Sequence, residues 1–248
     1  MKIAVSGKGG AGKTTVSGTI ARALARAGHE VIAIDADVNP MLGISLGLGM
    51  DGTERLAGLR QEVSESGNAN DAIHQYTIEG LIERFGEDAP DGVRIVVASR
   101  VDMPDQGCLC CGVSADRLLR EMEGGGRTVV GDLEAGIGVL SRMKKGSLDA
   151  VLVVANPTPK SIEVARRAAE AAVAREIPLI VVANRIANDE DLETITDVLG
   201  EYEIVIVPED PVIARADAEG LAPIDLDDTA PGVRAIVAII DRLVAVPA

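Results

Sequence analysis

The sequence predicts an α/β protein with a three-layer, doubly wound architecture, in which helices cover both faces of a mostly parallel sheet. Short apolar runs rich in β-branched residues alternate with longer helical patterns along the chain. The apolar runs are continuous, as in Val-Leu-Val-Val-Ala at 151–155, which is typical of parallel strands buried on both faces. The 248 residues, 47% of them hydrophobic and 25% charged, provide enough material for a substantial core.

The alternation can be followed from one end of the chain to the other. Strands are expected at residues 2–6, 30–35, 94–98, 128–132, 150–155, 179–183 and 203–207. Helices are expected at residues 13–27, 114–123, 161–175, 191–199, 212–219 and 232–244. The last of these is expected to pack as a core helix.

The region from about residue 51 to residue 92 is the least regular part of the chain. It mixes polar residues and glycine with weak helical periodicity near 81–85, which indicates a variable helical insertion or a set of loops. The chain has no internal repeat and no Pro/Ser-rich linker. We therefore expect residues 1–248 to form a single domain.

The overall charge and composition exclude several classes of function. The net charge is −15, and the chain contains one Phe, two Tyr and no Trp. Nucleic-acid binders need a cationic face, and single-strand binders also use aromatic platforms, so nucleic acid is not expected as a partner. No apolar run approaches membrane-spanning length, and the chain starts directly with a strand. We expect a cytoplasmic protein that does not bind a membrane.

A glycine-rich loop lies between the first expected strand and the first expected helix. Residues 7–15 read Gly-Lys-Gly-Gly-Ala-Gly-Lys-Thr-Thr. The glycines allow a tight turn that points backbone N–H groups at phosphate oxygens, and the helix N-terminus adds its dipole. Lys13 is expected to reach the terminal phosphates and the Thr14 hydroxyl to hold Mg²⁺. A plain glycine turn would not require a strand, a glycine loop, Lys-Thr and a helix to follow one another. The sequence therefore predicts a nucleoside triphosphate site formed by Gly9, Gly10, Ala11, Gly12, Lys13, Thr14 and Thr15.

Carboxylates follow two of the expected strands. The second strand ends in Asp35-Ala36-Asp37, and the fourth ends at Asp132. Ligands of open parallel sheets bind beyond the carboxyl ends of the strands. A single carboxylate there is often a helix cap or a turn former. Two such sites in one phosphate-loop protein favour Mg²⁺ and water as ligands, so Asp132 is expected to hold Mg²⁺ through its water shell and Asp35 to support that shell.

The three cysteines of the chain form one cluster, Gly-Cys-Leu-Cys-Cys-Gly at 107–112. In an extended segment Cys108 and Cys110 point to the same side, which makes them the first candidate pair of metal ligands. Ligation by Cys110 and Cys111 is the alternative. Two thiolates are an incomplete shell for Zn²⁺ or a similar metal, and a two-fold dimer would supply the missing pair. The contrasting interpretation is that these cysteines are small buried hydrophobic residues.

The glycine loop resembles the deviant Walker A motif because Lys8 follows its first glycine. This motif marks the P-loop NTPase family that contains the nitrogenase iron protein, the Min and Par partition ATPases and metal-insertion ATPases. The resemblance implies a MinD/NifH-like fold in which Lys8 crosses a dimer interface and touches the nucleotide of the other subunit. Two chains would then enclose Mg²⁺ and ATP, and hydrolysis would be coupled to association.

Further positions resemble the nucleotide contacts of that family. Asp37 looks like the switch residue that orients the attacking water. The pair Asn184-Arg185 follows a strand at the place where the family's asparagine contacts the amino edge of adenine. The segment Pro208-Glu209-Asp210 resembles the base-side loop after the last strand. An asparagine at a strand end is also a common turn former.

The complete set of motifs resembles the carbon monoxide dehydrogenase maturation ATPases of the CooC type, over nearly the whole chain. The resemblance implies ATP-dependent dimerisation, with Ni²⁺ held between two Cys-x-Cys loops and passed to a client such as carbon monoxide dehydrogenase. The chain departs from the pattern in two places: Val38 replaces a usual proline, and Cys111 is an additional thiol. A third thiol favours Zn²⁺, Cu⁺ or an iron–sulfur cluster as alternatives to nickel.

Two other functions fit parts of the sequence. A reductase of the nitrogenase iron protein type needs a second cysteine after the fourth strand, where this chain has Leu-Glu-Ala-Gly at 133–136. A positioning ATPase of the MinD type needs a basic amphipathic terminal helix, and residues 231–248 lack a cationic face. A DNA-binding ATPase of the ParA type is disfavoured by the net charge.

Overall fold

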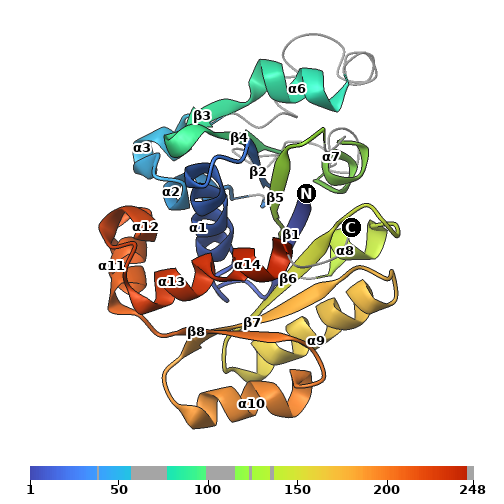
Figure 1. Ribbon diagram of the computed structural model, residues 1–248, viewed down its shortest axis with the longest axis vertical. Coiled ribbons are helices and arrows are strands. Elements are labelled where there is room, and N and C mark those ends of the chain that lie inside the picture. Colours follow the sequence, from blue (N-terminus) through green and yellow to red (C-terminus); the bar gives the residue numbers. More distant parts are fainter. Residues whose placement is uncertain (38, 57–76, 99–114, 123–124, 135–136, 245–248) are drawn as a thin grey trace, which may run out of the picture.

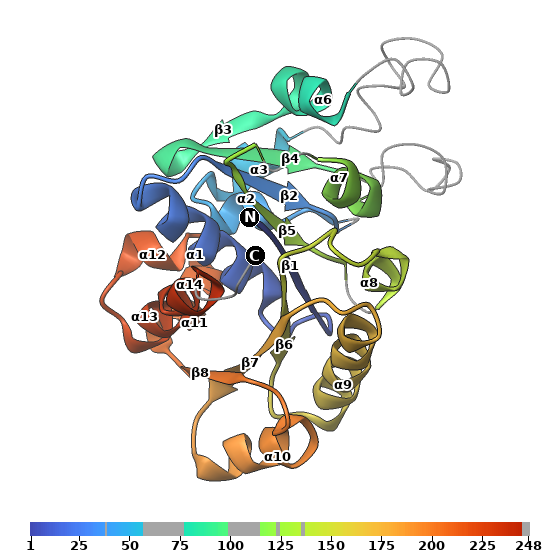
Figure 2. The same ribbon diagram turned by 45° about the vertical axis from the view of Figure 1, so that its right-hand side comes forward.

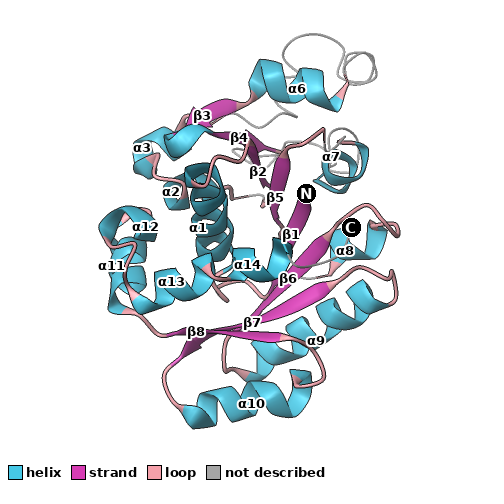
Figure 3. Ribbon diagram, viewed as in Figure 1, coloured by secondary structure: helices cyan, strands magenta, loops and turns pink. Residues whose placement is uncertain are grey.

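The computed structural model describes residues 1–37, 39–56, 77–98, 115–122, 125–134 and 137–244 (Figure 1). In this part of the chain, an eight-stranded, mostly parallel sheet carries helices on both faces (Figure 3). The predicted three-layer α/β fold is therefore confirmed.

The sheet has the strand order β3-β4-β2-β5-β1-β6-β7-β8. Its strands are β1 (Lys2–Gly7), β2 (Val31–Asp35), β3 (Glu87–Ala89), β4 (Val93–Val97), β5 (Thr128–Asp132), β6 (Ala150–Ala155), β7 (Leu179–Ile186) and β8 (Ile204–Pro208). The pairs are parallel except for β3, which runs antiparallel to β4 at one edge. Strand β1 lies between β5 and β6, so the residues that follow β1 emerge at the centre of the sheet.

Helices connect the strands and cover the sheet. They are α1 (Lys13–Arg26), α2 (Leu42–Ser45), α3 (Gly49–Glu54), α6 (Ile78–Phe85), α7 (Ala115–Glu121), α8 (Gly138–Arg142), α9 (Pro159–Val173), α10 (Asp189–Leu199), α11 (Pro211–Glu219), α12 (Pro223–Leu226), α13 (Pro231–Val237) and α14 (Ile239–Val244). A short 3₁₀ helix, η1 (Pro90–Gly92), precedes β4. Several helices begin with proline, whose fixed φ suits the first helical position.

Two apolar cores lie on opposite faces of the sheet. In β1, Ile3 and Val5 point into the core beneath α1, whereas Ala4 points into the core beneath α9. Figure 2 shows α1 and α13 on one side of the sheet and α7, α8 and α9 on the other. Each fully buried aliphatic side chain contributes about 1.5–3 kcal/mol. Burial of both strand faces explains why the strands are continuous apolar runs rather than alternating ones.

The irregular region contains structure that the sequence pattern did not indicate. Strand β3 has the sequence Glu-Asp-Ala and no apolar run, so it carries no recognisable strand signal. Helix α6 confirms the weak periodicity noted near 81–85, because Leu81 and Ile82 are buried. Residues 57–76, which also belong to this region, lie outside the described residues.

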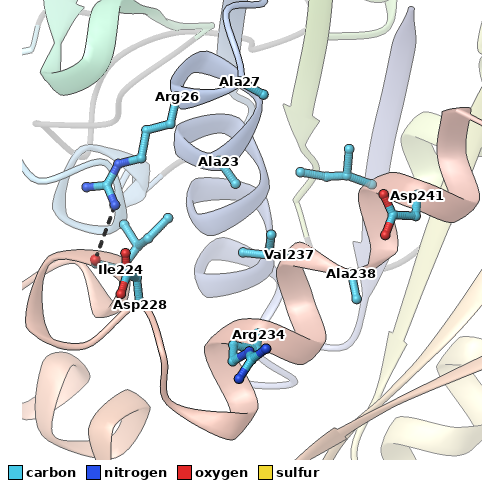
Figure 4. A pocket seen from close by; sticks show the side chains of 10 residues that line it. Ala23, Arg26, Ala27, Ile224, Asp228, Arg234, Val237, Ala238 and Asp241 are labelled. Atoms are coloured by element: carbon cyan, nitrogen blue, oxygen red, sulfur yellow. Dashed lines mark hydrogen bonds between the residues drawn. The ribbon is translucent and has the colours of Figure 1, made fainter.

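The expected terminal helix is divided into α13 and α14 at Ala238. Ile236, Ile239 and Leu243 are buried in the core beneath α1, as expected for a core helix. Between these helices and α1 lies a cavity of about 570 Å³, whose wall includes Ala23 and Val237 (Figure 4). Among the described residues, no helix is both long and apolar enough to cross a membrane.

A buried arginine connects α1 to distant parts of the chain. Arg22 is 2% exposed and donates from Nε to Asp91 Oδ2 at 2.6 Å and from Nη2 to Asp225 Oδ1 at 2.8 Å. Its Nη1 also donates to the carbonyl oxygen of Leu46 at 2.6 Å. Arg26, which is exposed, binds the same two carboxylates. The network holds η1, the end of α2 and α12 against α1.

We predict that Arg22→Met lowers the free energy of unfolding by about 2 kcal/mol. The reason is that Asp91, Asp225 and the carbonyl oxygen of Leu46 lose the hydrogen bonds that the buried guanidinium group donates. Arg26→Met, the matched control, should cost less than about 1 kcal/mol because Arg26 is largely solvated. Urea denaturation of both variants measures the difference. Equal losses would contradict the structural role assigned to Arg22.

Candidate nucleotide-binding site

The glycine loop has the backbone geometry that the sequence predicts. Gly7, Gly10 and Gly12 have φ values of 148°, 78° and 101°, which side chains rarely tolerate. A Cβ atom on Gly7 would lie 2.3 Å from the carbonyl oxygen of Val154. Gly12 is the N-cap of α1, and the α1 backbone N–H groups follow it directly. The loop therefore presents donors and a helix dipole at the carboxyl end of β1.

The two lysines of the loop lie in different environments. Lys13 is 7% exposed, and its Nζ lies 3.5 Å from the carbonyl oxygen of Lys8. The ammonium group is thus held above the loop, where a phosphate would bind. Lys8 is half-buried and donates from Nζ to the carbonyl oxygen of Gly9 at 3.3 Å. In the single chain, Lys8 is folded back onto its own loop.

Asp132 lies directly beneath the start of α1. In the sheet it pairs in register with Val5 of β1 and with Asp35 of β2. Its Oδ2 accepts a hydrogen bond from Thr14 Oγ1 at 2.7 Å, and its Oδ1 accepts one from Ser17 Oγ at 3.1 Å. Ser17 belongs to no motif that the sequence displays, although it follows Lys13 by four residues and so lies on the same face of α1.

Asp35 organises the segment that follows β2. Its Oδ1 accepts a hydrogen bond from the backbone N–H of Asp37 at 3.1 Å, and its Oδ2 accepts one from Leu42 at 2.8 Å. Asp37 is half-buried, and its Oδ1 accepts from the backbone N–H of Asn39 at 3.0 Å. These hydrogen bonds hold Asp37, Asn39 and Leu42 at the carboxyl end of β2. Val38 lies outside the described residues.

The buried carboxylates give the site an unusual electrostatic state. Burial raises the pKa of Asp35, and the negative charge of Asp132 raises it further. Burial also raises the pKa of Asp132, although the Thr14 hydrogen bond and the Lys13 charge oppose this effect. Hard oxygen donors from Thr14, Asp132 and Asp35 are the set that Mg²⁺ prefers, so the residues present fit this ion. A bound cation would stabilise the ionised forms of Asp35 and Asp132 relative to their protonated forms.

A second cavity, of about 230 Å³, lies beside the loop. Asn184 lines it, is 6% exposed, and donates from Nδ2 to the carbonyl oxygen of Ala11 at 2.8 Å. The amide is therefore a direct link between the cavity and the phosphate loop. The full lining is Gly12, Thr15, Asn184, Arg185, Pro208, Glu209, Asp210, Ile213, Ala214 and Asp217. The structure thus brings together Thr15 and all five residues expected on the base side.

Two base-side residues have features that sequence patterns did not reveal. Arg185 has a φ of 62° at the point where the pairing of β7 with β8 is irregular. A non-glycine residue in this conformation often marks a functional site. Asp210 is 5% exposed, and its oxygens accept hydrogen bonds from the backbone N–H groups of Val212 and Gly232. Asp210 therefore caps α11 and also shapes the cavity wall.

The cysteine cluster cannot be placed relative to this site. Cys108, Cys110 and Cys111 lie outside the described residues. In the described part of the chain, no group of three or more His, Cys, Asp or Glu side chains is arranged to hold a metal ion. The proposed thiolate site therefore stays a prediction from the sequence.

The CobQ/CobB/MinD/ParA nucleotide binding domain family matches residues 2–224. The chain belongs to this family. Its relatives include an uncharacterised ATP-binding protein of Methanocaldococcus jannaschii, which is 30% identical over 93% of each chain. The carbon monoxide dehydrogenase accessory protein CooC of Rhodospirillum rubrum is 30% identical over 91% of this chain and 90% of its own length.

Solved structures of the CobQ/CobB/MinD/ParA family have the same fold. MinD of Pyrococcus horikoshii, complexed with Mg-ADP, has a TM-score of 0.72 and 21% identity over 100% of this chain and 98% of its own. MinD of Aquifex aeolicus has a TM-score of 0.69 and 24% identity over the same shares of the two chains. At this level of identity the likeness concerns the fold alone.

We predict that Asp132→Asn stabilises the nucleotide-free protein at about pH 8.5 but much less at about pH 4. The folded-state pKa of Asp132 lies above the unfolded value of 3.8. The wild type is therefore most favoured below about pH 4 and loses stability as the pH rises through the folded pKa. Asparagine carries no charge and can still pair with both hydroxyl groups. The expected gain at high pH is on the order of 1 kcal/mol or more.

Urea denaturation at both pH values tests this expectation. Asp197→Asn on α10, which removes an exposed carboxylate, is the matched control and should show little change with pH. A gain for Asp132→Asn that is the same at both pH values would contradict the assigned electrostatics.

Proposed function

We propose that this protein is a Mg-ATP-dependent ATPase that dimerises, binds a metal ion between the Cys-x-Cys loops of two subunits and delivers it to a metalloenzyme. The ATPase proposal rests on one observation. Lys13, Thr14, Asp132 and Asp35 lie together at the carboxyl ends of the central strands. Membership of the CobQ/CobB/MinD/ParA family supports the same chemistry. Metal delivery rests on the cysteine cluster and on the similarity to CooC.

Adenine is the base that the cavity favours. Since Asn184 Nδ2 donates to Ala11, its Oδ1 is left to accept a hydrogen bond from a ligand. Adenine offers an exocyclic amino donor, whereas guanine offers a carbonyl acceptor at the corresponding position. Asn184 is thus proposed to select ATP, with Arg185, Pro208, Glu209 and Asp210 forming the surrounding wall.

The hydrolytic roles follow from the positions of the side chains. The loop N–H groups and Lys13 bind and orient the phosphates, and they stabilise the negative charge that develops on them. Thr14 would hold Mg²⁺ directly and Asp132 through its water shell, with Asp35 supporting that shell; the ion supplies charge neutralisation when bound. Asp37 is proposed to orient the attacking water. Lys8 is proposed to leave its own loop and contact the nucleotide of the second subunit.

The metal at the cysteines is treated as cargo. Cys108 and Cys110 from each of two chains would provide four thiolates, and Cys110 with Cys111 is the alternative pair. Ni²⁺ is the proposed cargo because of the similarity to CooC, and Zn²⁺ or an iron–sulfur cluster are the alternatives. The client would be a carbon monoxide dehydrogenase-like enzyme.

We predict that Lys13→Ala abolishes nucleotide-dependent dimerisation, because the phosphates lose their main buried cation. Asp37→Ala should still bind ATP and remain dimeric, with hydrolysis reduced by about 100-fold or more. Asp51→Ala, an exposed carboxylate on α3, is the control and should behave as the wild type. Light scattering and phosphate release measure both properties. Wild-type hydrolysis by Asp37→Ala would remove its proposed role, and a permanent monomer with Mg-ATP would remove the dimer.

We predict that Cys108→Ser/Cys110→Ser leaves ATP binding intact and abolishes a stoichiometry of about one metal ion per dimer. Cys111→Ser should retain the metal if Cys108 and Cys110 are the ligands. Elemental analysis of apo and ATP-loaded protein measures metal content. Unchanged metal in the double variant would contradict the bridging site, whereas iron with acid-labile sulfide in the wild type would favour a reductase.

A further inference from the structure

The surface at the ends of α7 and α8 has a charge opposite to that of the protein as a whole. A cavity of about 380 Å³ is lined there by Arg120, Glu121, Lys144, Lys145, Gly146 and Ser147. It lies beside the segments that lead into β5 and β6, at the edge of the sheet away from the nucleotide loop. We refer to it as the basic cavity. In a chain with a net charge of −15, three cations around one cavity stand out.

Among the residues that the structure describes, cations outnumber carboxylates around the basic cavity. Asp116, which is 6% exposed, accepts from Arg142 Nε at 3.1 Å and lies 3.9 Å from Arg120 Nη2. One buried carboxylate therefore serves two guanidinium groups. Among the described residues, no carboxylate lies within ion-pairing distance of Lys144 Nζ. The two remaining cations, Arg117 and Lys145, are paired with Glu121 and Glu176 respectively.

Lys144 and Lys145 lie on a turn whose backbone is held by hydrogen bonds to Ser147. Ser147 Oγ donates to the carbonyl oxygen of Lys144 at 2.6 Å and accepts from the backbone N–H of Lys144 at 3.2 Å. Gly146 has a φ of 75°, which closes the turn. Helix α7 contacts α8, so Arg120 is held on the opposite wall. The backbone of the turn is thus ordered before a partner binds, which lowers the entropic cost of binding.

We propose that the basic cavity binds an acidic polypeptide segment of a partner protein. Glu121 also lines the cavity and would repel a compact anion such as phosphate. An extended segment can place one carboxylate at Lys144 and another at Arg120, and keep a neutral residue next to Glu121. Such complementarity speeds association and selects the partner. A nucleic-acid strand carries a negative charge at every phosphate and could not place a neutral group next to Glu121.

The test uses a fluorescein-labelled peptide of alternating glutamate and glycine and fluorescence anisotropy with the full chain at low salt. The wild type should bind it, and Arg120→Gln/Lys144→Gln should bind about tenfold more weakly. Arg167→Gln/Arg215→Gln is the matched control, because it removes two exposed cations at other places and should weaken binding less than about twofold. The charge-preserving variant Arg120→Lys/Lys144→Arg should bind as the wild type, which separates charge from folding.

Several results would overturn the proposal. These are no peptide binding by the wild type, equal weakening by the two neutralising variants, or loss of binding in the charge-preserving variant. Displacement of the peptide by inorganic phosphate at matched ionic strength would assign the cavity to a small anion. Tighter binding of a single-stranded oligonucleotide would assign it to nucleic acid. None of these measurements depends on ATP hydrolysis or on the cysteines.

Discussion

Two carboxylates buried next to each other at the carboxyl ends of β2 and β5 are the constraint on which the site depends. Asp35 and Asp132 are paired in register, are almost completely buried, and repel each other when ionised. Two hydroxyl groups and two backbone N–H groups compensate part of this cost. The free protein therefore retains an unfavourable electrostatic term that a bound cation would remove, and ligand binding would be linked to stability.

Helix α1 connects this electrostatic centre to the rest of the molecule. Its first two turns carry Lys13, Thr14 and Ser17, and its later turns carry Arg22 and Arg26. Gly18 allows α2 to approach closely, because a Cβ atom there would lie 2.5 Å from the Cβ atom of Ser45. The segment that begins at Asp35 and Asp37 thus continues into a helix that is packed tightly on α1. A shift of the segment that follows β2 must therefore be accommodated by α1, and a shift of α1 by that segment.

The sequence allowed the layers of the fold and the phosphate loop to be predicted, because both have local signals. Continuous apolar runs mark strands buried on two faces, and the glycine pattern marks a loop with positive φ values. Strand β3 was missed because its three residues contain no apolar run. The pairing of Arg22 with Asp225 was missed because an ion pair between residues so far apart leaves no periodic trace. The conformation of Arg185 depends on the pairing of β7 with β8, which a one-dimensional pattern does not contain.

The pairing of Arg22 with Asp225 also has a consequence for biosynthesis. The family match ends at residue 224, one position before the carboxylate that binds this arginine. A ribosome synthesises Leu46 and Asp91 long before Asp225, so the guanidinium group of Arg22 in a nascent chain can at first pair only with these earlier partners. The ion-pair network of the first helix is therefore completed only after Asp225 has been made. A chain truncated before Asp225 would lack one of the acidic partners of its first helix.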